Sequence, residues 1–145
     1  MAELVAAVDV GTGSARAGLF DASGRLLGRA EHPIALHEPA PDHTEQDSED
    51  IWRAVCAAVR GARAEAATGP DAVAGLAFAA TCSLVLLDAA GRQLSVSTGG
   101  EPRWNTILWL DHRAPAPKPR NAPPPAMRCS TTSAAPCPRR CRSPS

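Results

Sequence analysis

Residues 4–20, LVAAVDVGTGSARAGLF, decide the fold of this chain. Two apolar segments, Leu4–Val10 and Ala15–Phe20, flank a polar turn at Gly11–Ser14. A second turn of sequence DASG follows, and it returns the chain as a third extended segment over Arg25–Glu31. We therefore predict that the glycine-containing turn joins two strands of a β-meander, and not a strand and a helix.

The glycines of this turn allow two phosphate-binding interpretations. A dinucleotide-binding fingerprint needs G-x-G-x-x-G at the start of a helix. Here Arg16 occupies the position of the third glycine, and the next turn follows too soon for a helix. In a β-hairpin, by contrast, Gly11 and Gly13 let backbone N–H groups approach an anion, and Thr12 and Ser14 add hydroxyl donors. The sequence favours the hairpin.

Asp9 and Arg16 add charge on either side of the turn. A carboxylate at Asp9 is suited to holding Mg²⁺ through water, and Arg16 supplies a permanent positive charge for phosphate. The alternative is an ordinary hairpin loop with a solvated aspartate, which the pattern D-x-G-T alone does not exclude. The longer pattern D-x-G-T-x-S-x-R is more specific and predicts a phosphate site.

One amphipathic helix is predicted over Asp47–Ala67. Asp47 or Ser48 can cap it, and acidic residues follow in its first turn, where the helix dipole favours them. Apolar residues recur every three to four positions, which predicts one buried stripe with Trp52 beside it in the core. The stripe consists of Ile51, Val55, Val59 and Ala62.

Three apolar segments after the helix are predicted to be strands. Val73–Ala80 is an apolar run and Leu84–Asp88 is apolar up to its last residue, which predicts two buried strands. Thr106–Leu110 is the last predicted strand, and it leads into Asp111 and Arg113.

The composition changes at residue 114. Residues 1–113 carry nine basic and 15 acidic side chains, whereas residues 114–145 carry six basic and no acidic ones and nine of the 14 prolines. A segment without apolar periodicity cannot repay its ordering entropy by burial. We therefore predict one structured part over residues 1–113 and a disordered Pro/Arg/Ser-rich tail over residues 114–145.

Cysteine usage and the start of the chain predict a cytoplasmic protein. Cys56 and Cys82 are the two cysteines of residues 1–113, a pattern typical of a reducing compartment. The first residues lack a basic segment followed by an apolar one, and no apolar run is long enough to span a membrane. Neither a membrane nor a nucleic acid is expected as a partner.

Four separated segments carry a family resemblance: DVGTGSARAGLFDASGRLLG, PDHTEQDSEDIWRAVCAAVRGA, GLAFAATCSLVLLDAAGR and NTILWLDHRA. From about Leu4 to Ala114 the chain resembles the FGGY carbohydrate kinases, members of the actin/hexokinase/Hsp70 superfamily. It most resembles the subgroup that phosphorylates D-ribulose or a related pentulose or pentitol. The resemblance implies an α/β, ribonuclease H-like lobe that begins β-β-β-α-β with a mixed sheet, and that is incomplete because a kinase of this family is several times longer.

The resemblance also implies a chemistry, the transfer of the ATP γ-phosphate to a sugar or polyol hydroxyl with Mg²⁺. The residues that would bind the ATP phosphates are Asp9, Gly11, Thr12, Gly13, Ser14 and Arg16, with Asp9 also holding Mg²⁺ through water. The residues that would bind the substrate are Thr81, Cys82, Trp109, Asp111 and Arg113. The general-base aspartate and the nucleotide-binding second lobe of the family would lie beyond this chain. No catalytic residue is assigned, and the isolated chain is expected to be inactive.

Two departures from the family pattern affect these expectations. Ala79 stands where the ribulose-type run G-F-D-A-T-C-S has aspartate, and losing such a hydrogen-bonded contact costs about 1–3 kcal/mol. Where the family continues with an Ala-Glu-Ala-Glu-like helical stretch, this chain has Pro117-Lys118-Pro119. A one-base shift of GC-rich codons for the former gives the latter, so we predict that the tail is frame-shifted.

Two other functions remain open at this point. The chain could be a non-catalytic sugar- or nucleotide-binding fragment. It could also be a ribonuclease H-like, metal-dependent nuclease that uses Asp9 with a second carboxylate such as Asp88. The acidic excess of residues 1–113 disfavours the nuclease, because phosphate backbones attract basic surfaces.

Overall fold

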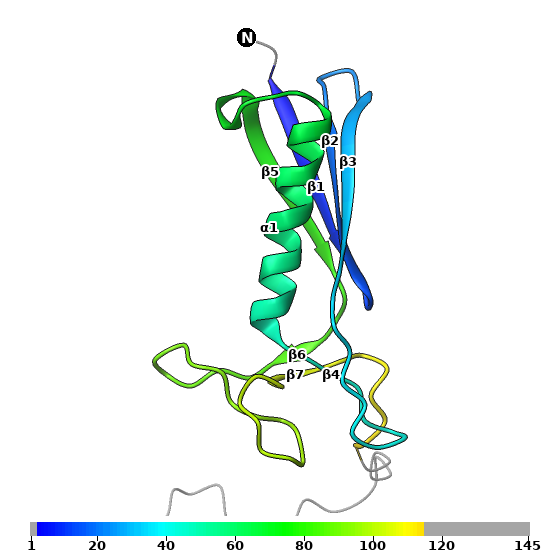
Figure 1. The fold of residues 1–145 in the computed structure, drawn as a ribbon, viewed down its shortest axis with the longest axis vertical. Helices are drawn as coiled ribbons and strands as arrows, with labels where there is room; N and C mark the ends of the chain where they lie inside the picture. The colour runs from blue at the N-terminus through cyan, green and yellow to red at the C-terminus, as the bar shows by residue number, and fades with distance from the viewer. Residues whose placement is uncertain (1–2, 115–145) are drawn as a thin grey trace, which may run out of the picture. The chain divides into compact units, whose positions relative to one another are not determined.

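A computed structural model describes residues 3–114 of the protein (Figure 1). The predicted disordered tail over residues 114–145, and the frame shift predicted for it, lie outside the described residues apart from residue 114 itself. No helix of the described part is long and apolar enough to cross a membrane. In chain order the elements are β1 (Leu4–Val10), β2 (Ser14–Phe20), β3 (Leu26–Pro33), β4 (Glu45–Gln46), α1 (Ser48–Glu65), the short 3₁₀ helix η1 (Pro70–Ala72), β5 (Val73–Ala80), β6 (Leu84–Val85) and β7 (Thr106–Ile107).

Four strands form a mixed sheet in the order β3-β2-β1-β5 (Figure 1). The pairs β1–β2 and β2–β3 are antiparallel, as hairpin-connected neighbours must be, and β5 is parallel to β1. A parallel pair needs a crossover connection, here the one that contains α1, and this connection places the helix on one face of the sheet. The predicted β-β-β-α-β order and the mixed sheet are confirmed.

Alternation along the strands gives the sheet two different faces. Leu4, Ala6 and Val8 are buried in β1, whereas their neighbours Val5 and Ala7 are exposed. Because successive side chains of a strand point to opposite faces, the buried set lies on the face that α1 packs against, which we call the covered face. The other side, the open face, carries Val5, Ala7, Asp9, Arg16, Gly18 and Phe20.

Helix α1 has the cap and the buried stripe that the sequence predicts. The Asp47 side chain accepts a hydrogen bond from the backbone N–H of Glu49 at 2.9 Å, which satisfies a donor of the first turn. Val55 and Ala62 of the predicted stripe are buried, and its other two residues pack at the border of the core. The buried residues beneath the helix are Val8, Ala15, Ala17, Ile34, Ala54, Val55, Ala58 and Ala62.

Glycine occupies two of the contact points between helix and sheet. A Cβ at Gly28 of β3 would collide with the backbone carbonyl oxygen of Ala62. A Cβ at Gly61 of α1 would lie 2.7 Å from the Cβ of Ala30, nearer than such atoms approach. Small residues on both surfaces therefore set the distance between helix and sheet.

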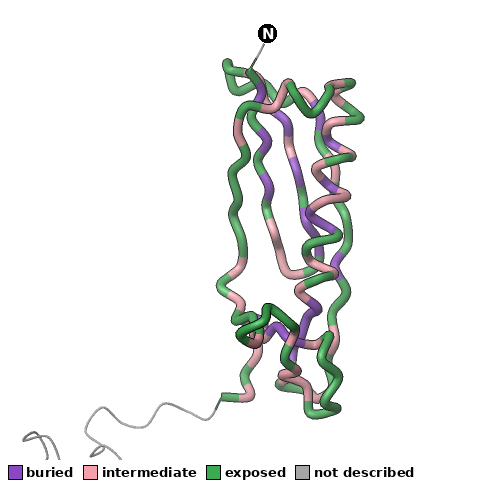
Figure 2. Tube along the Cα trace, turned by 90° about the vertical axis from the view of Figure 1, so that its left-hand side faces the viewer, coloured by how far each residue is buried: buried purple, intermediate pink, exposed green. Residues whose placement is uncertain are grey.

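The structure corrects the predicted environment of β5 and of the helix tryptophan. The bounds of β5 are as predicted, but its side chains are largely exposed, with Leu76 at 53% and Phe78 at 52% (Figure 2). Trp52, which we expected in the core, is 58% exposed. Both predictions are wrong for one reason. The helix packs on β2 and β3, and β5 lies beyond it at the edge of the sheet.

The last two predicted strands are shorter than expected. The predicted strand Leu84–Asp88 is reduced to β6, and Thr106–Leu110 is reduced to β7. Each ends early because the chain turns, at Asp88–Arg92 after β6 and at Leu108–Asp111 after β7. With β4 they form a second small sheet in the order β4-β7-β6.

Candidate functional site

The turn between β1 and β2 is held by contacts from distant parts of the chain. The Gly13 carbonyl oxygen accepts a hydrogen bond from the Ile34 N–H at 2.9 Å. The Thr12 carbonyl oxygen accepts one from Gln46 Nε2 at 2.7 Å, and the Thr12 hydroxyl accepts one from Trp109 Nε1 at 3.4 Å. A loop restrained in this way loses little entropy when it binds an anion, which suits a phosphate-binding turn.

The turn contributes to a pocket that unites two groups of predicted site residues. Gly11 and Thr12, from the predicted phosphate-binding set, line it together with Thr81, Cys82 and Trp109, from the predicted substrate-binding set. Its volume is about 450 Å³, large enough for a small polar ligand, and it opens to solvent. Parallel pairing of β5 with β1 causes this convergence, because the carboxyl ends of the two strands lie side by side.

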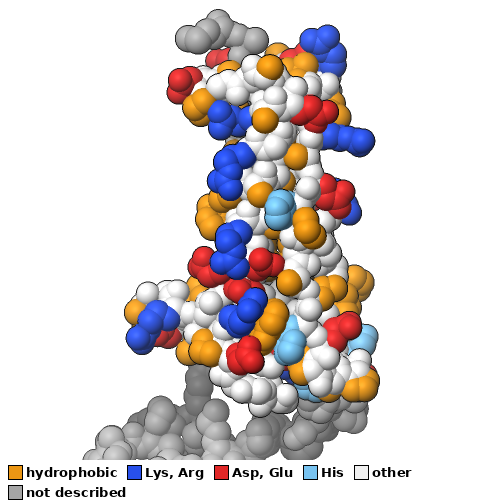
Figure 3. Space-filling model, viewed as in Figure 1, with side chains coloured by type: hydrophobic (Ala, Val, Ile, Leu, Met, Phe, Trp, Pro, Cys, Tyr) orange, Lys and Arg blue, Asp and Glu red, His pale blue; other side chains and the backbone are white. Residues whose placement is uncertain are grey.

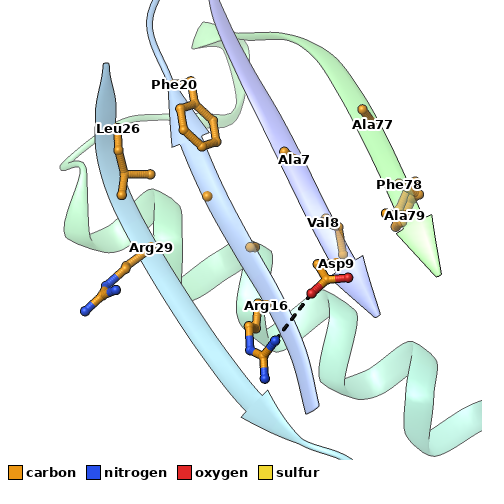
Figure 4. A pocket seen from close by; sticks show the side chains of 12 residues that line it. Ala7, Val8, Asp9, Arg16, Phe20, Leu26, Arg29, Ala77, Phe78 and Ala79 are labelled. Atoms are coloured by element: carbon orange, nitrogen blue, oxygen red, sulfur yellow. Dashed lines mark hydrogen bonds and ion pairs between the residues drawn. The ribbon is translucent and has the colours of Figure 1, made fainter. Parts of the chain in front are cut away.

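On the open face, Asp9 and Arg16 point toward each other from neighbouring strands (Figure 4). Arg16 Nη1 lies 3.4 Å from Asp9 Oδ2, and Arg16 Nε lies 3.3 Å from Glu31 Oε1. The Ser14 hydroxyl donates to the same Glu31 oxygen at 2.6 Å. This hydrogen bond, followed by that from Arg16, lowers the pKa of Glu31. Ser14 and Arg16 are thus engaged with Glu31, whereas the Asp9 side chain is 56% exposed.

Asp111 and Arg113 lie in a buried polar network. The Asp111 side chain is 1% exposed and accepts hydrogen bonds from the Thr44 N–H at 2.7 Å and from Arg113 Nη2 at 2.7 Å. Arg113 Nη2 also donates to Glu45, which is fully buried, at 2.8 Å. The hydrogen bonds from Arg113 and from the Thr44 N–H hold the pKa of Asp111 well below its usual range. The structure places these two residues outside the lining of the pocket that contains Thr81 and Trp109.

Ala79 lies beside Asp9, on the open face. The two residues are register partners in the β1–β5 pair, and both line the depression on the open face drawn in Figure 4. An aspartate at position 79, as the family pattern has it, would therefore add a second carboxylate next to the first. Its absence affects the surroundings of Asp9 more directly than those of Thr81.

Two functional residues escaped the sequence analysis. Gln46 is buried and positions the turn through the Thr12 carbonyl oxygen. Glu45 is buried beneath Arg113. Both lie in the segment PDHTEQD that contributes to the family resemblance, but neither has a local pattern that indicates burial. Their partners are 34 and 68 residues away, so only the folded chain identifies them.

The residues present fit a magnesium ion only in part. Within residues 3–114 there is no group of three or more His, Cys, Asp or Glu side chains that could enclose a metal. Mg²⁺ in phosphoryl-transfer sites usually has one or two protein carboxylates, with water and phosphate oxygens completing its coordination. The exposed carboxylate of Asp9, next to the turn, matches that requirement.

The described part of the chain is an α/β lobe of the sugar-kinase type. A crystal structure of a kinase from Brucella ovis, described as a xyloylose kinase, superposes on it with a TM-score of 0.66 and 26% sequence identity. The superposition covers 77% of this chain and 22% of the other. Residues 4–116 match the model of the FGGY family of carbohydrate kinases, N-terminal domain. The chain belongs to the FGGY family of carbohydrate kinases.

Curated relatives agree with this assignment. The human FGGY carbohydrate kinase domain-containing protein is 50% identical over 109 residues, which are 74% of this chain and 19% of the relative. A D-ribulokinase of Saccharomyces cerevisiae is 42% identical over 116 residues, which are 78% of this chain and 16% of the relative. The chain thus spans about a fifth of the length of the curated relatives it matches.

Proposed function

We propose that this lobe serves an ATP-dependent sugar kinase that phosphorylates a pentulose or pentitol such as D-ribulose or ribitol. The observation that carries the proposal is the shared pocket, in which the Gly11–Thr12 turn faces the Thr81–Cys82 link and Trp109. Phosphoryl transfer depends on holding the phosphate and the acceptor side by side, and a glycine-containing turn beside an aromatic side chain and the Thr81 hydroxyl is suited to that. The identity with a yeast D-ribulokinase supports the pentulose as substrate.

Each residue group has a defined task in this proposal. The Gly11 N–H donates to the Ser14 carbonyl oxygen at 2.9 Å, so the N–H groups that the turn offers to phosphate are those of Thr12 and Gly13. Asp9 holds Mg²⁺ through water. The indole of Trp109 packs on the C–H face of the sugar, while Thr81 provides a hydroxyl for its hydrogen bonds. ATP supplies the phosphoryl group, and Mg²⁺ neutralises charge on its phosphates. Because no general base is assigned in the chain, it is expected to bind ligands without turning them over.

The resemblance implies that Asp111 and Arg113 bind the substrate, but we propose a different role for them. We propose that they position the segment that carries Trp109, because their side chains are engaged with Glu45 and with backbone groups. The assignment of residues 114–145 to a separate, frame-shifted tail, the cytoplasmic location and the restriction to small-molecule partners remain predictions.

The test is to measure binding and turnover separately. Tryptophan fluorescence of the full chain is titrated with D-ribulose, ribitol and D-xylulose, and with Mg²⁺–ATP. Turnover is followed by ADP release. A sugar-dependent change that disappears in Trp109→Phe supports the proposal, and so does an ATP signal that weakens at least tenfold in Asp9→Asn. Asp71→Asn, an exposed aspartate in η1, is the matched control and should behave as the unmodified chain.

The same titration distinguishes the other functions. Binding without ADP release supports the fragment as a binding lobe, and it leaves turnover to the longer, frame-restored protein. The nuclease is disfavoured by Asp88, whose carboxylate accepts the Ala90 and Arg92 N–H groups and pairs with Arg92 Nε at 2.7 Å within its own turn. Absence of any ligand-dependent signal at millimolar sugar and ATP would contradict the proposed function.

A further inference from the structure

A row of charged side chains crosses the open face of the sheet beside the glycine-containing turn. Asp9 of β1 is the register partner of Arg16 of β2, and Arg16 is the register partner of Glu31 of β3. On its other side Asp9 pairs with Ala79 of β5, where the row of charges ends. Facing residues of neighbouring strands have Cβ atoms about 4.5–5.5 Å apart, so their side chains interact directly. The guanidinium of Arg16 therefore lies between two carboxylates.

The two carboxylates share the Arg16 guanidinium without using all of its donors. Arg16 Nε donates to Glu31 Oε1 at 3.3 Å, and Arg16 Nη1 donates to Asp9 Oδ2 at 3.4 Å, the contact that is drawn in Figure 4. Among residues 3–114, neither Arg16 Nη2 nor Asp9 Oδ1 has a hydrogen-bond or ion-pair partner. Arg16 thus keeps donors for an anion, and Asp9 keeps an oxygen for the water of a hydrated cation.

Ser14 fixes the position of the Glu31 carboxylate. The Ser14 hydroxyl donates to Glu31 Oε1 at 2.6 Å, and Ser14 itself is buried on β2. Within the described part of the chain, the hydrogen bonds of the Glu31 carboxylate come from Ser14 and Arg16 alone. Both bonds favour the charged carboxylate and lower its pKa, the bond from Ser14 most. Because a buried hydroxyl on a strand is a rigid support, Ser14 restricts where Glu31 can hold the guanidinium.

The position of Glu31 decides how the positive charge of Arg16 is shared. Charge pairs alone do not indicate a function in this chain, because acidic and basic side chains also lie close together on the face that carries α1 (Figure 3). Without Glu31, however, the Arg16 guanidinium would be free to turn fully onto Asp9 and to contact both of its carboxylate oxygens, the geometry that such pairs favour. That contact would occupy the Asp9 oxygen that a hydrated cation needs, together with the donors that a phosphate needs.

We propose that Glu31 is a positioning residue that, anchored by Ser14, holds Arg16 beside Asp9 and so keeps Arg16 available to phosphate and Asp9 available to hydrated Mg²⁺. The inference rests on the proposed function and assigns a task within it to a residue outside the predicted site. It also gives Ser14 the task of supporting Glu31, in place of donating directly to phosphate. Both residues act through Arg16, and neither is expected to touch a ligand.

The test combines Glu31→Gln with Arg16→Gln in a double-mutant cycle on the binding of Mg²⁺–ATP. Glutamine at position 31 keeps an acceptor for the Ser14 hydroxyl and removes the charge that holds Arg16. Binding is followed by tryptophan fluorescence of the full chain at low ionic strength, where exposed charges are screened least. We expect Glu31→Gln to weaken Mg²⁺–ATP binding at least about threefold in the unmodified background and to have no effect in the Arg16→Gln background.

A simple effect of charge on ATP binding has the opposite sign. Removing a negative charge near an anion site should tighten ATP binding in both backgrounds, so tighter binding, or an equal change with and without Arg16→Gln, overturns the proposal. Glu65→Gln is the matched control. Glu65 lines the same depression as Glu31, but its carboxylate accepts the Arg29 N–H and has no hydrogen bond or ion pair with Arg16 or Ser14. The control should leave binding unchanged, and a loss equal to that in Glu31→Gln contradicts the proposal.

A measurement without ligand tests the geometry itself. In ¹H–¹⁵N spectra at mildly acidic pH, the Arg16 Nε–H signal is assigned by its loss in Arg16→Lys. It should shift in Glu31→Gln and in Ser14→Ala and keep its position in Glu65→Gln, and an unshifted signal in Glu31→Gln overturns the proposal. Absence of ATP binding by the unmodified chain would contradict the proposed function and this inference with it. ATP binding that is insensitive to Glu31→Gln would contradict this inference alone, so the two failures are distinguishable.

Discussion

The molecule has two buried regions that are built on opposite principles. The core beneath α1 consists of alanine, valine and isoleucine side chains. Glycines lie where the helix and the sheet touch. The second region, which we call the polar cluster, consists of Glu45, Asn105, Thr106, Asp111 and Arg113. Burial of apolar side chains stabilises the first without partners, whereas charged and amide groups are costly to bury unless hydrogen bonds satisfy them.

The difference shows how each region depends on the rest of the chain. Truncating one small side chain in the apolar core leaves a cavity, and the resulting loss of stability is local and limited. A group missing from the polar cluster leaves its buried partner without a counter-charge. The polar cluster also joins the segment before α1 to the end of β7 and to Trp109, so it connects the fold to the pocket.

Removing the cation of the polar cluster should have the largest effect. Arg113→Met keeps the aliphatic stem but leaves Glu45 and Asp111 buried and unpaired, so we expect the free energy of unfolding to fall by about 3–5 kcal/mol. Urea unfolding measures it. The control Arg25→Met removes an exposed pair with Asp21 and should cost at most about 1 kcal/mol. Equal losses in the two variants would show that the cluster is not effectively buried.

The variant Asp111→Asn tests whether the polar cluster depends on charge, because its effect on the free energy of unfolding should change with pH. At pH 7 it should cost about 1.5–3 kcal/mol, because hydrogen bonds to a charged group are lost. The pKa of Asp111 is lowered in the folded protein, so its carboxylate stabilises the fold fully above the unfolded pKa of about 3.9. That contribution is lost as the pH falls further, toward the folded pKa. The difference in stability between the two proteins should therefore be constant down to about pH 5 and shrink below about pH 4. A difference that does not change down to pH 2 would contradict the role of the charge.

Much of the apolar region was predictable from the sequence, and the reason is local. The bounds of β1 and β5 and the stripe of α1 follow from alternation and helical spacing in neighbouring residues. The exposure of β5 was not predictable, because burial depends on which element lies over a strand. The apolar residues Leu76 and Phe78 of β5 line a groove beside α1 and are not covered by it.

The polar cluster and half of the candidate site were not predictable, because their contacts join distant residues. Asp111 and Arg113 have the composition of a sugar site or of a surface ion pair, and only the fold shows that Arg113 pairs with the buried Glu45 as well as with Asp111. The turn at Gly11–Gly13 was predictable from its composition, but its support by Gln46 was not. The convergence of Thr12 with Thr81 required the parallel β1–β5 register.

The apolar region should be most sensitive where helix and sheet touch. In Gly28→Ala the new Cβ meets the Ala62 backbone, so α1 must move and we expect a loss of about 1–3 kcal/mol in thermal or urea unfolding. Gly75→Ala in β5 is the matched control, since an added Cβ there has no heavy atom within 4 Å. The control should be neutral, and a comparable loss in both would argue against close helix–sheet packing.

The helix cap should have the smallest effect of the four. Asp47→Ala removes the acceptor for the Glu49 N–H, together with a hydrogen bond from Gln93 Nε2, and should cost about 0.5–2 kcal/mol. Glu49→Ala, at an exposed first-turn position, removes only a favourable dipole interaction and should cost less than about 1 kcal/mol. Thermal unfolding by circular dichroism at 222 nm compares them, and a larger loss in Glu49→Ala would contradict the assignment of the cap.

The position of β5 also has a consequence for the order in which the protein assembles. The meander β1–β2–β3 pairs neighbouring segments, whereas β5 must close a loop of about 70 residues before it meets β1. Its backbone N–H groups should therefore be the last of the main sheet to gain protection against hydrogen exchange and the first to lose it. Because the Gly11–Thr12 turn belongs to the early meander and Thr81–Cys82 to the late strand, the pocket is completed only in the final docking step, and each transient opening of β5 dismantles it while leaving the turn intact.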